Sequence, residues 1–135
     1  MIVADTSLIA SLLLLTQATP FAEAVLEKDA DWTAPALWRY EFKNVLATQI
    51  RVLGLPLDDA IALFEKAEEL VIEPEIETDP AVILGLASAR KLSAYDAEFV
   101  GLAQALKVKL VTADSGILKA APELAVSLDH FAAGA

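Results

Sequence analysis

Short apolar runs alternate along this chain with longer segments in which apolar residues recur at helical spacing. The run at 1–4 is typical of a buried strand, and capping side chains at 5–7 then precede an apolar segment at 8–15. The same pattern predicts strands at 31–35, 71–73, 108–112 and 125–128, and helices at 20–28, 36–53, 56–70, 93–106, 114–121 and from 79 onward. This alternation predicts an α/β fold, a three-layer α/β/α sandwich with a central, mainly parallel sheet.

The composition is that of one folded domain. The chain has 135 residues, of which 56% are hydrophobic and 22% charged, so we expect a single domain over 1–135. The absence of Cys excludes disulfides and thiol nucleophiles, and a single His excludes a histidine-rich metal site. The apolar segment 8–15 is too short for a membrane span or a signal sequence, so we expect a cytoplasmic protein without membrane association.

Acidic residues outnumber basic ones by 20 to 10, which gives a formal net charge of −10. This balance excludes a protein that holds anionic partners with a broad basic surface. Most of the charge lies between Asp58 and Asp79, where nine acids are accompanied only by Lys66. We interpret this stretch as the solvated face of a helix and the loop that follows it.

Three aspartates stand where predicted helices begin. Asp5 follows the first strand, and Asp114 comes two residues after the strand at 108–112, so in a parallel sheet both lie at carboxyl ends and could be close in space. Each could instead cap the helix that follows it. Asp96 stands in the pattern Ser93-Ala-Tyr-Asp96, which could likewise serve as an imperfect capping box.

Glu41 lies on or at the edge of an apolar stripe, three residues after Trp38 and four before Val45. A buried carboxylate requires a partner because desolvation disfavours its charged form, whereas at the edge of the stripe it would reach water. If Glu41 and the three aspartates converge at one end of the sheet, their charges repel unless a cation is bound. Oxygen ligands suit Mg²⁺ or Mn²⁺. Glu98 lies about 200° around the helix from Asp96 and would be a peripheral ligand at most.

Four segments carry these acids: Ile2-Val-Ala-Asp5-Thr-Ser-Leu-Ile9, Pro35-Ala-Leu-Trp-Arg-Tyr-Glu41, Leu92-Ser-Ala-Tyr-Asp96-Ala-Glu-Phe-Val-Gly-Leu-Ala103 and Leu110-Val-Thr-Ala-Asp114. In order and spacing they resemble the four acidic motifs of PIN-domain ribonucleases, in particular those of the toxins of VapBC-type toxin–antitoxin pairs. An Asp after a strand is common, but four such motifs in sequence are fairly specific. The resemblance runs from the first strand to the last and covers essentially the whole chain.

The resemblance implies a PIN-like fold and an endoribonuclease that depends on Mg²⁺ or Mn²⁺, cleaves RNA and is inhibited by a cognate antitoxin. Its catalytic quartet falls on Asp5, Glu41, Asp96 and Asp114. We expect Asp5, Asp96 and Asp114 to be the nearer metal ligands and Glu41 to act through water, with the metal activating water for attack on the phosphodiester. Ser7 and Thr112 match small hydroxyl positions and would orient carboxylates or water; a helix cap and an ordinary strand residue are the alternatives.

RNA would have to be held despite the negative charge. Arg39 and Lys43 flank Glu41 and are four residues apart, so they share one side of the helix and could contact phosphates beside the site. Salt bridges or solvent exposure are the alternative for both side chains.

The apolar content also suggests a surface that another chain covers. Leu12 to Leu15, Trp38 and Phe42 are the candidates for such a surface. The resemblance implies a homodimer and an antitoxin segment that lies over the active-site groove.

Features of the sequence argue against three other functions. A PIN-like scaffold could bind a partner without cleaving it, although all four acids are present. A phospho-acceptor receiver domain has a similar sheet but needs adjacent acids after the first strand and a Lys after the last, where this chain has Asp5 alone and no Lys beyond Lys119. A hydrolase that uses His130 would need a positioned Ser motif, and the sequence has none.

Overall fold

The central sheet is small, parallel and four-stranded. A computed structural model of the chain describes residues 1–134, and its strands are β1 (Ile2–Ala4), β2 (Trp32–Thr33), β3 (Leu110–Val111) and β4 (Ala125–Val126). Their order is β2-β1-β3-β4, and each neighbouring pair is parallel. The parallel α/β/α architecture expected from the sequence is therefore confirmed.

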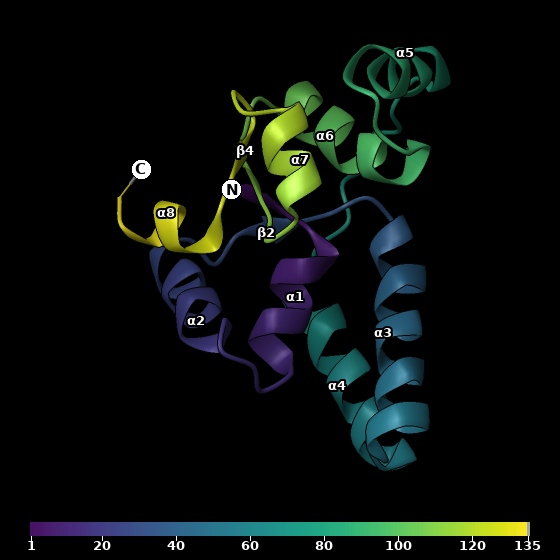
Figure 1. Ribbon diagram of the computed structural model, residues 1–135, viewed down its shortest axis with the longest axis vertical. Helices are drawn as coiled ribbons and strands as arrows, with labels where there is room; N and C mark the ends of the chain where they lie inside the picture. The colour runs from purple at the N-terminus through teal and green to yellow at the C-terminus, as the bar shows by residue number, and fades with distance from the viewer. Residues whose placement is uncertain (135) are drawn as a thin grey trace.

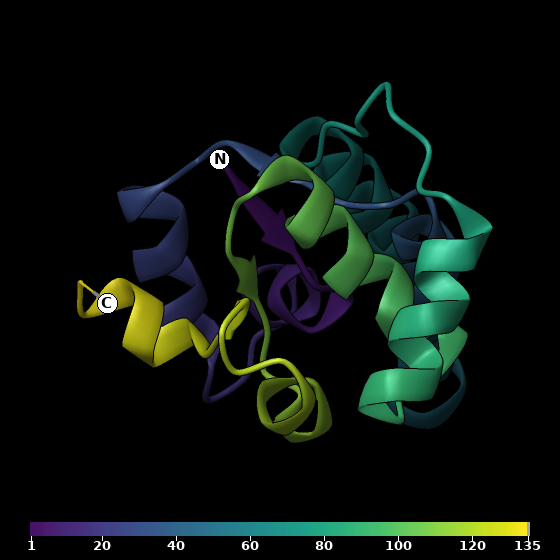
Figure 2. The ribbon, with the colours of Figure 1, turned by 90° about the horizontal axis from the view of Figure 1, so that it is seen from above.

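Helices cover both faces of this sheet. They are α1 (Thr6–Leu13), α2 (Thr19–Lys28), α3 (Leu37–Leu53), α4 (Leu57–Leu70), α5 (Pro80–Arg90), α6 (Ala94–Leu106), α7 (Ser115–Ala120) and α8 (Leu128–Ala132). α6 contacts β1 and β3 on one face, and α1 contacts β1 on the other. Figures 1 and 2 show α2, α3 and α4 on the side of α1, and α5 beyond α6. Between residues 1 and 134, no helix combines the length and apolarity that a membrane span requires.

The helix ends follow the signals in the sequence. α3 ends at Gly54, whose φ of 70° is left-handed, as a glycine allows. α5 begins after Asp79, whose carboxylate accepts the amide of Ala81. At the start of α6 the Ser93 hydroxyl accepts the amide of Asp96 at 3.0 Å, so the capping interpretation of Ser93 is confirmed.

The strands are shorter than the apolar runs that predict them. The run at 108–112 contributes only Leu110–Val111 to the sheet. The run at 71–73 contributes a single bridge between Val71 and Trp32, and Pro74, which has no amide to donate, follows soon after. Small parallel strands between helices place the loops after their carboxyl ends close together.

The core comprises the sheet and the helices on both of its faces, and it extends to the packing of α3 against α4. Trp38 and Phe42 are completely buried, so their interpretation as an exposed partner surface is wrong. The rings of both pack against Phe64 of α4, with centroids 5.5 and 6.2 Å away. Of the other candidates for that surface, Leu15 is 96% exposed. The aromatic contacts hold α3 against α4 and fix the helix that carries Glu41.

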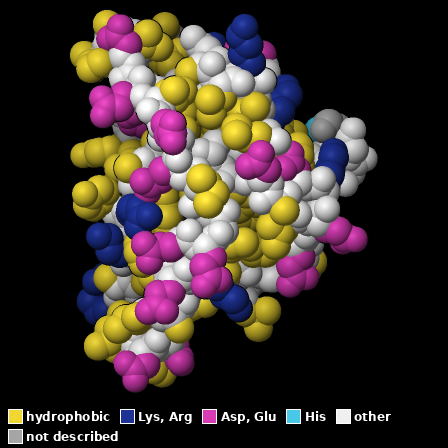
Figure 3. Space-filling model, turned by 180° about the vertical axis from the view of Figure 1, so that it is seen from behind, with side chains coloured by type: hydrophobic (Ala, Val, Ile, Leu, Met, Phe, Trp, Pro, Cys, Tyr) yellow, Lys and Arg dark blue, Asp and Glu magenta, His cyan; other side chains and the backbone are white. Residues whose placement is uncertain are grey.

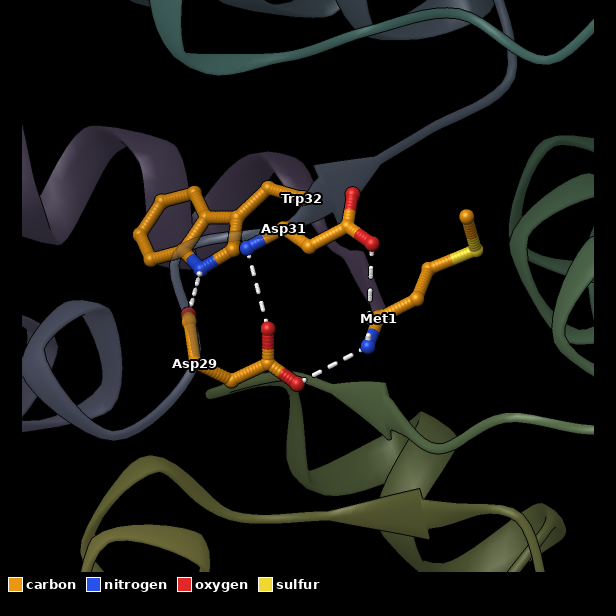
Figure 4. Close-up of polar contacts among 4 residues, drawn as sticks. All are labelled: Met1, Asp29, Asp31 and Trp32. Carbon is orange, nitrogen blue, oxygen red and sulfur yellow. Dashed lines mark hydrogen bonds and ion pairs between the residues drawn. The ribbon is translucent and has the colours of Figure 1, made fainter.

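The start of β1 is held by an ion pair with the loop before β2 (Figure 4). The Met1 ammonium donates to Asp29 Oδ2 at 2.9 Å and lies 3.9 Å from Asp31 Oδ2. Asp29 Oδ1 accepts the amide of Asp31 at 2.9 Å, and the Asp29 carbonyl accepts the Trp32 indole N–H at 2.7 Å. Burial alone would raise the pKa of Asp29, but the hydrogen bonds from the ammonium and the Asp31 amide bring it below its usual value.

Candidate active site

The carboxyl ends of β1 and β3 bring Asp5 and Thr112 side by side. Ala4 pairs with Val111, the last residue of β3. The Asp5 amide then donates to the Val111 carbonyl at 3.1 Å. Asp5 and Thr112 are therefore the first residues beyond two neighbouring parallel strands, which is where α/β proteins commonly place their functional groups.

Two hydroxyl groups hold the Asp5 carboxylate. Ser7 Oγ donates to Asp5 Oδ2 at 2.6 Å, and Thr112 Oγ1 donates to the same oxygen at 2.8 Å. Asp5 stands at the N-cap position of α1, but its side chain accepts no amide of that helix. The residue is only 6% exposed, so these two hydroxyl groups replace water as hydrogen-bond donors to its carboxylate.

Asp114, in contrast, does cap a helix. Its Oδ1 accepts the amide of Ile117 at 3.0 Å at the start of α7. Its own amide donates to Thr112 Oγ1 at 3.0 Å, and the amide of Ala113 donates to Ser7 Oγ at 3.0 Å. The hydroxyl groups of Ser7 and Thr112 therefore connect the segment after β3 to Asp5.

Glu41 approaches the same region from the second turn of α3. Its Oε1 accepts Thr6 Oγ1 at 2.7 Å, and Thr6 is buried next to Asp5 in the sequence. The helix turns Trp38 and Phe42 into the core and leaves Glu41 half-buried at the edge of that face. The edge position, with a hydrogen-bond donor supplied by Thr6, is therefore the one that the structure adopts.

The four acids singled out in the sequence line one pocket of about 370 Å³. They are Asp5 after β1, Glu41 of α3, Asp96 in the first turn of α6, and Asp114 before α7. Among residues 1–134, no Lys or Arg lines this pocket. Glu98 lies outside it, and its Oε2 accepts Thr78 Oγ1 at 3.1 Å.

The electrostatics of the pocket oppose full ionisation. Burial raises the pKa of Glu41, and the charges of Asp5 and Asp96 raise it further, whereas the Thr6 hydroxyl lowers it. Burial also raises the pKa of Asp96, as do the charges of Asp114 and Asp5, and hydrogen bonding from Ser93 acts in the other direction. Bringing these carboxylates together therefore costs free energy until a proton or a cation reduces the charge.

The donor chemistry of the pocket fits a hard divalent cation. Carboxylate and hydroxyl oxygens are the ligands that Mg²⁺ and Mn²⁺ prefer. As the side chains stand, no three His, Cys, Asp or Glu groups within the described residues are placed to hold a metal ion together. One oxygen each of Asp5, Glu41 and Asp114 is directed to a hydroxyl or amide donor. Coordination by this set therefore requires the carboxylates to rotate toward a shared point.

The two cations expected to hold phosphates beside Glu41 lie elsewhere. Arg39 forms ion pairs with Glu68 and Glu73, and Lys43 lies over the ring of Tyr40, 4.8 Å from its centroid. Neither residue lines the carboxylate pocket. On a helix, positions two residues from Glu41 point about 200° away from it, and Arg39 adopts the salt-bridge alternative.

Two polar residues of the pocket were not singled out from the sequence. Thr6 supplies the hydrogen bond to Glu41, and Asn44 lines the pocket. Asn44 stands three residues after Glu41 on α3, so helical spacing alone could have placed it there. The role of Thr6 had no such signal because its partner is 35 positions away in the chain.

Comparisons with known proteins agree with this fold. Residues 2–123 match the PIN domain family. The solved structure described as "Crystal structure of PAE2754 from Pyrobaculum aerophilum" is similar with a TM-score of 0.75 and 21% sequence identity, over 98% of this chain and 93% of that chain. At this identity the similarity concerns the fold alone. No curated protein sequence matches this chain.

Proposed function

This chain belongs to the PIN domain family, whose fold is generally that of metal-dependent nucleases, and we propose that it is an endoribonuclease that acts as the toxin of a VapBC-type pair. The observation that carries the nuclease proposal is the single pocket that four acids from four separate segments line. The likeness of those segments to VapBC toxins supports the toxin role. The family match over 2–123 supports a single domain over 1–135.

Asp5, Asp96 and Asp114 would hold Mg²⁺ or Mn²⁺, and Glu41 would act through water. When bound, the cation supplies Lewis acidity, which activates water and offsets charge on the phosphate oxygens. Ser7 and Thr112 keep Asp5 in place through hydrogen bonds of 2.6 and 2.8 Å. Such partners of ligands commonly influence metal affinity and activity.

The reaction proposed is hydrolysis of an RNA phosphodiester. The water oxygen forms a bond to phosphorus, the bond from phosphorus to the leaving ribose oxygen breaks, and that oxygen takes up a proton. A pocket carboxylate accepts the proton that the water loses. Glu41 suits this role because it is not one of the proposed direct metal ligands, and because burial and neighbouring acids raise the pKa of its carboxyl.

A homodimer and a cognate antitoxin complete the proposal. Several large apolar side chains are more than half exposed, which supports contact with other chains. They include Leu15, Tyr40, Val52, Leu53, Leu57, Ile72, Leu84 and Tyr95. Light scattering of the isolated chain tests the homodimer. We expect the mass of a dimer, and the mass of a monomer would contradict this part of the proposal.

Cleavage of a fluorescently labelled RNA tests the nuclease proposal. With Mg²⁺ or Mn²⁺ the wild-type protein should cleave, and EDTA should abolish cleavage. Asp5→Asn should reduce the rate by at least about 100-fold, since even the partners of metal ligands contribute about 10- to 100-fold. Asp59→Asn, an exposed acid of α4, is the matched control and should cleave like wild type.

Cleavage that survives both EDTA and Asp5→Asn would contradict the proposal. Failure of the wild-type protein to cleave with either metal would also overturn it and leave a binding scaffold. Expression of the wild-type chain should arrest growth, and Asp5→Asn should relieve the arrest; unaffected growth would overturn the toxin role.

A further inference from the structure

A second pocket, with basic side chains, adjoins the carboxylate pocket. It has a volume of about 390 Å³ and is lined by Arg90, Lys91 and Lys119 together with Asp96 and Gly116. Three of the chain's ten basic residues thus gather at one place. The protein as a whole has a net charge of −10, so this group of basic side chains is a candidate binding site for an anion.

The two pockets share one residue, Asp96, and Gly116 of the basic pocket lies close to a second acid of the carboxylate pocket. Asp96 lines both of them. Gly116 lines the basic pocket, and a Cβ atom at that position would lie 3.0 Å from Asp114 Oδ1, closer than an ordinary contact. The lack of a side chain at Gly116 therefore leaves room for the Asp114 carboxylate beside the basic pocket.

Two of the three cations are available to a ligand. Arg90 is engaged, because it forms an ion pair with Glu123 and donates to the Ala120 carbonyl at 3.0 Å. Lys91 and Lys119 are exposed, and neither forms an ion pair with any residue between 1 and 134. The surface seen from behind in Figure 3 carries, by contrast, many scattered acidic side chains.

The backbone fixes both lysines. Lys91 is the C-cap of α5 with a left-handed φ of 55°, and its amide donates to the Ala87 carbonyl. Lys119 lies in the last turn of α7. Arg90 links the end of α5 to the end of α7 through Ala120, so the two ammonium groups are carried on segments that are tied together.

We propose that this basic pocket binds backbone phosphates of the RNA strand next to the one that is cleaved. The strand then passes from the carboxylate pocket over Asp96 and Gly116, and Lys91 and Lys119 each neutralise one phosphate. This inference rests on the proposed function and names the part of the surface that holds its substrate. Unlike Arg39 and Lys43, Lys91 and Lys119 line a pocket that shares Asp96 with the carboxylate pocket.

The test compares two double variants that remove the same charge. Lys91→Gln/Lys119→Gln removes the proposed contacts. Lys107→Gln/Lys66→Gln is the control, because Lys107 is also a helix C-cap, with a φ of 57°, and Lys66 is an exposed lysine of α4 like Lys119 of α7. Each pair is made in the Asp5→Asn background with Mg²⁺, so that the RNA stays intact.

Fluorescence anisotropy with a labelled single-stranded RNA gives the affinity at several salt concentrations. Each phosphate contact to a single strand contributes about 0.7 to the slope of log K against log salt, so the Lys91/Lys119 variant should lose about 1.4 of slope. The control should keep the slope of its parent. In the cleaving background, the Lys91/Lys119 variant should raise KM with little change in kcat.

The outcomes separate the two proposals. If the wild-type protein cleaves RNA but the two double variants have equal salt slopes, the basic-pocket contact is overturned and the nuclease proposal stands. Equal weakening by both pairs would mean a general effect of charge and would also overturn the contact. If the wild-type chain neither binds nor cleaves RNA, both proposals fail together.

Discussion

Two acidic regions of this molecule differ in how their charge is compensated. In the hairpin of α3 and α4, Arg39 forms ion pairs with Glu68 and Glu73. The carboxylate pocket, in contrast, is lined by four acids and by no Lys or Arg of residues 1–134. Two acids packed against α3 are therefore paired with a cation of the chain itself, whereas the pocket requires a proton or a cation from outside.

The same helix serves both regions. Arg39 and Glu41 are two residues apart on α3 and so point about 200° away from each other. The pKa of Arg39 is raised by its hydrogen bonds to Glu68 and Glu73, and the pKa of Glu41 is raised by burial and by neighbouring acids. Two charged residues that are close in sequence can thus lie in different environments, one with its counter-charges supplied by the chain and one without.

Of the changes considered, binding of a divalent cation should alter the free energy of unfolding most. Mn²⁺ at a concentration 100 times its Kd should stabilise the folded protein by about 2.7 kcal/mol, because only the folded pocket brings the carboxylates together. Thermal unfolding with and without the metal measures this stabilisation. Asp96→Asn should remove most of it, while Glu68→Gln in the hairpin should retain it. Equal metal stabilisation in both variants would place the cation outside the pocket.

Removing the cation of the hairpin should have an intermediate effect. Arg39→Met should lower the free energy of unfolding by roughly 1 kcal/mol, since its two ion pairs are about one-third exposed and water screens them. RNA cleavage and the salt dependence of RNA binding should stay at the wild-type level. Urea unfolding measures the first expectation and the anisotropy titration the second. A smaller slope of log K against log salt in Arg39→Met would instead show that Arg39 contacts RNA.

The pH dependence of stability should give the smallest effects, with opposite signs at two carboxyl groups. The pKa of Glu41 is raised in the folded state, so its contribution to stability is fully present below the ordinary pKa of 4.5 and is lost as the pH rises through the folded pKa. In EDTA, Glu41→Gln should therefore be more stable than wild type at neutral pH by some tenths of a kcal/mol, with the gain vanishing in acid.

Asp29 is the counterpart, because its pKa is lowered in the folded state. Its contribution is present above the ordinary pKa of 3.8 and is lost as the pH falls through the folded pKa. Asp29→Asn should therefore be less stable than wild type at neutral pH, by at most about 1 kcal/mol. Urea unfolding at neutral and acid pH measures both variants, and a shift of the same sign in each would contradict the comparison.

Much of the fold could be predicted from the sequence because its signals are local. Gly54, Pro80 and Ser93 mark helix ends where the structure has them. The strand runs placed Asp5 and Asp114 at carboxyl ends, which is where they lie. The partners of side chains were not predictable in the same way, because they depend on how distant helices pack.

Several contacts show this limit. Arg39 meets Glu68 and Glu73 only because α4 folds back along α3. Trp38 is buried because Phe64 covers it, although its position on the helix also allowed exposure. The neighbourhood of Lys119 and Asp96 arises where α7 and α6 come together, which no spacing in the sequence indicates.

The hydrogen bond between Thr112 and Asp5 joins residues 107 positions apart. Such long-range contacts form late in folding, because the chain must first lose the entropy of closing a large loop before the contact can stabilise it. The carboxylate pocket is therefore incomplete on any nascent chain that lacks the third strand and the turn after it. Since β1 spans only Ile2–Ala4, a register slip of one residue would turn Asp5 to the other face of the sheet. Assembly of the pocket thus reports that β1 and β3 have paired in register.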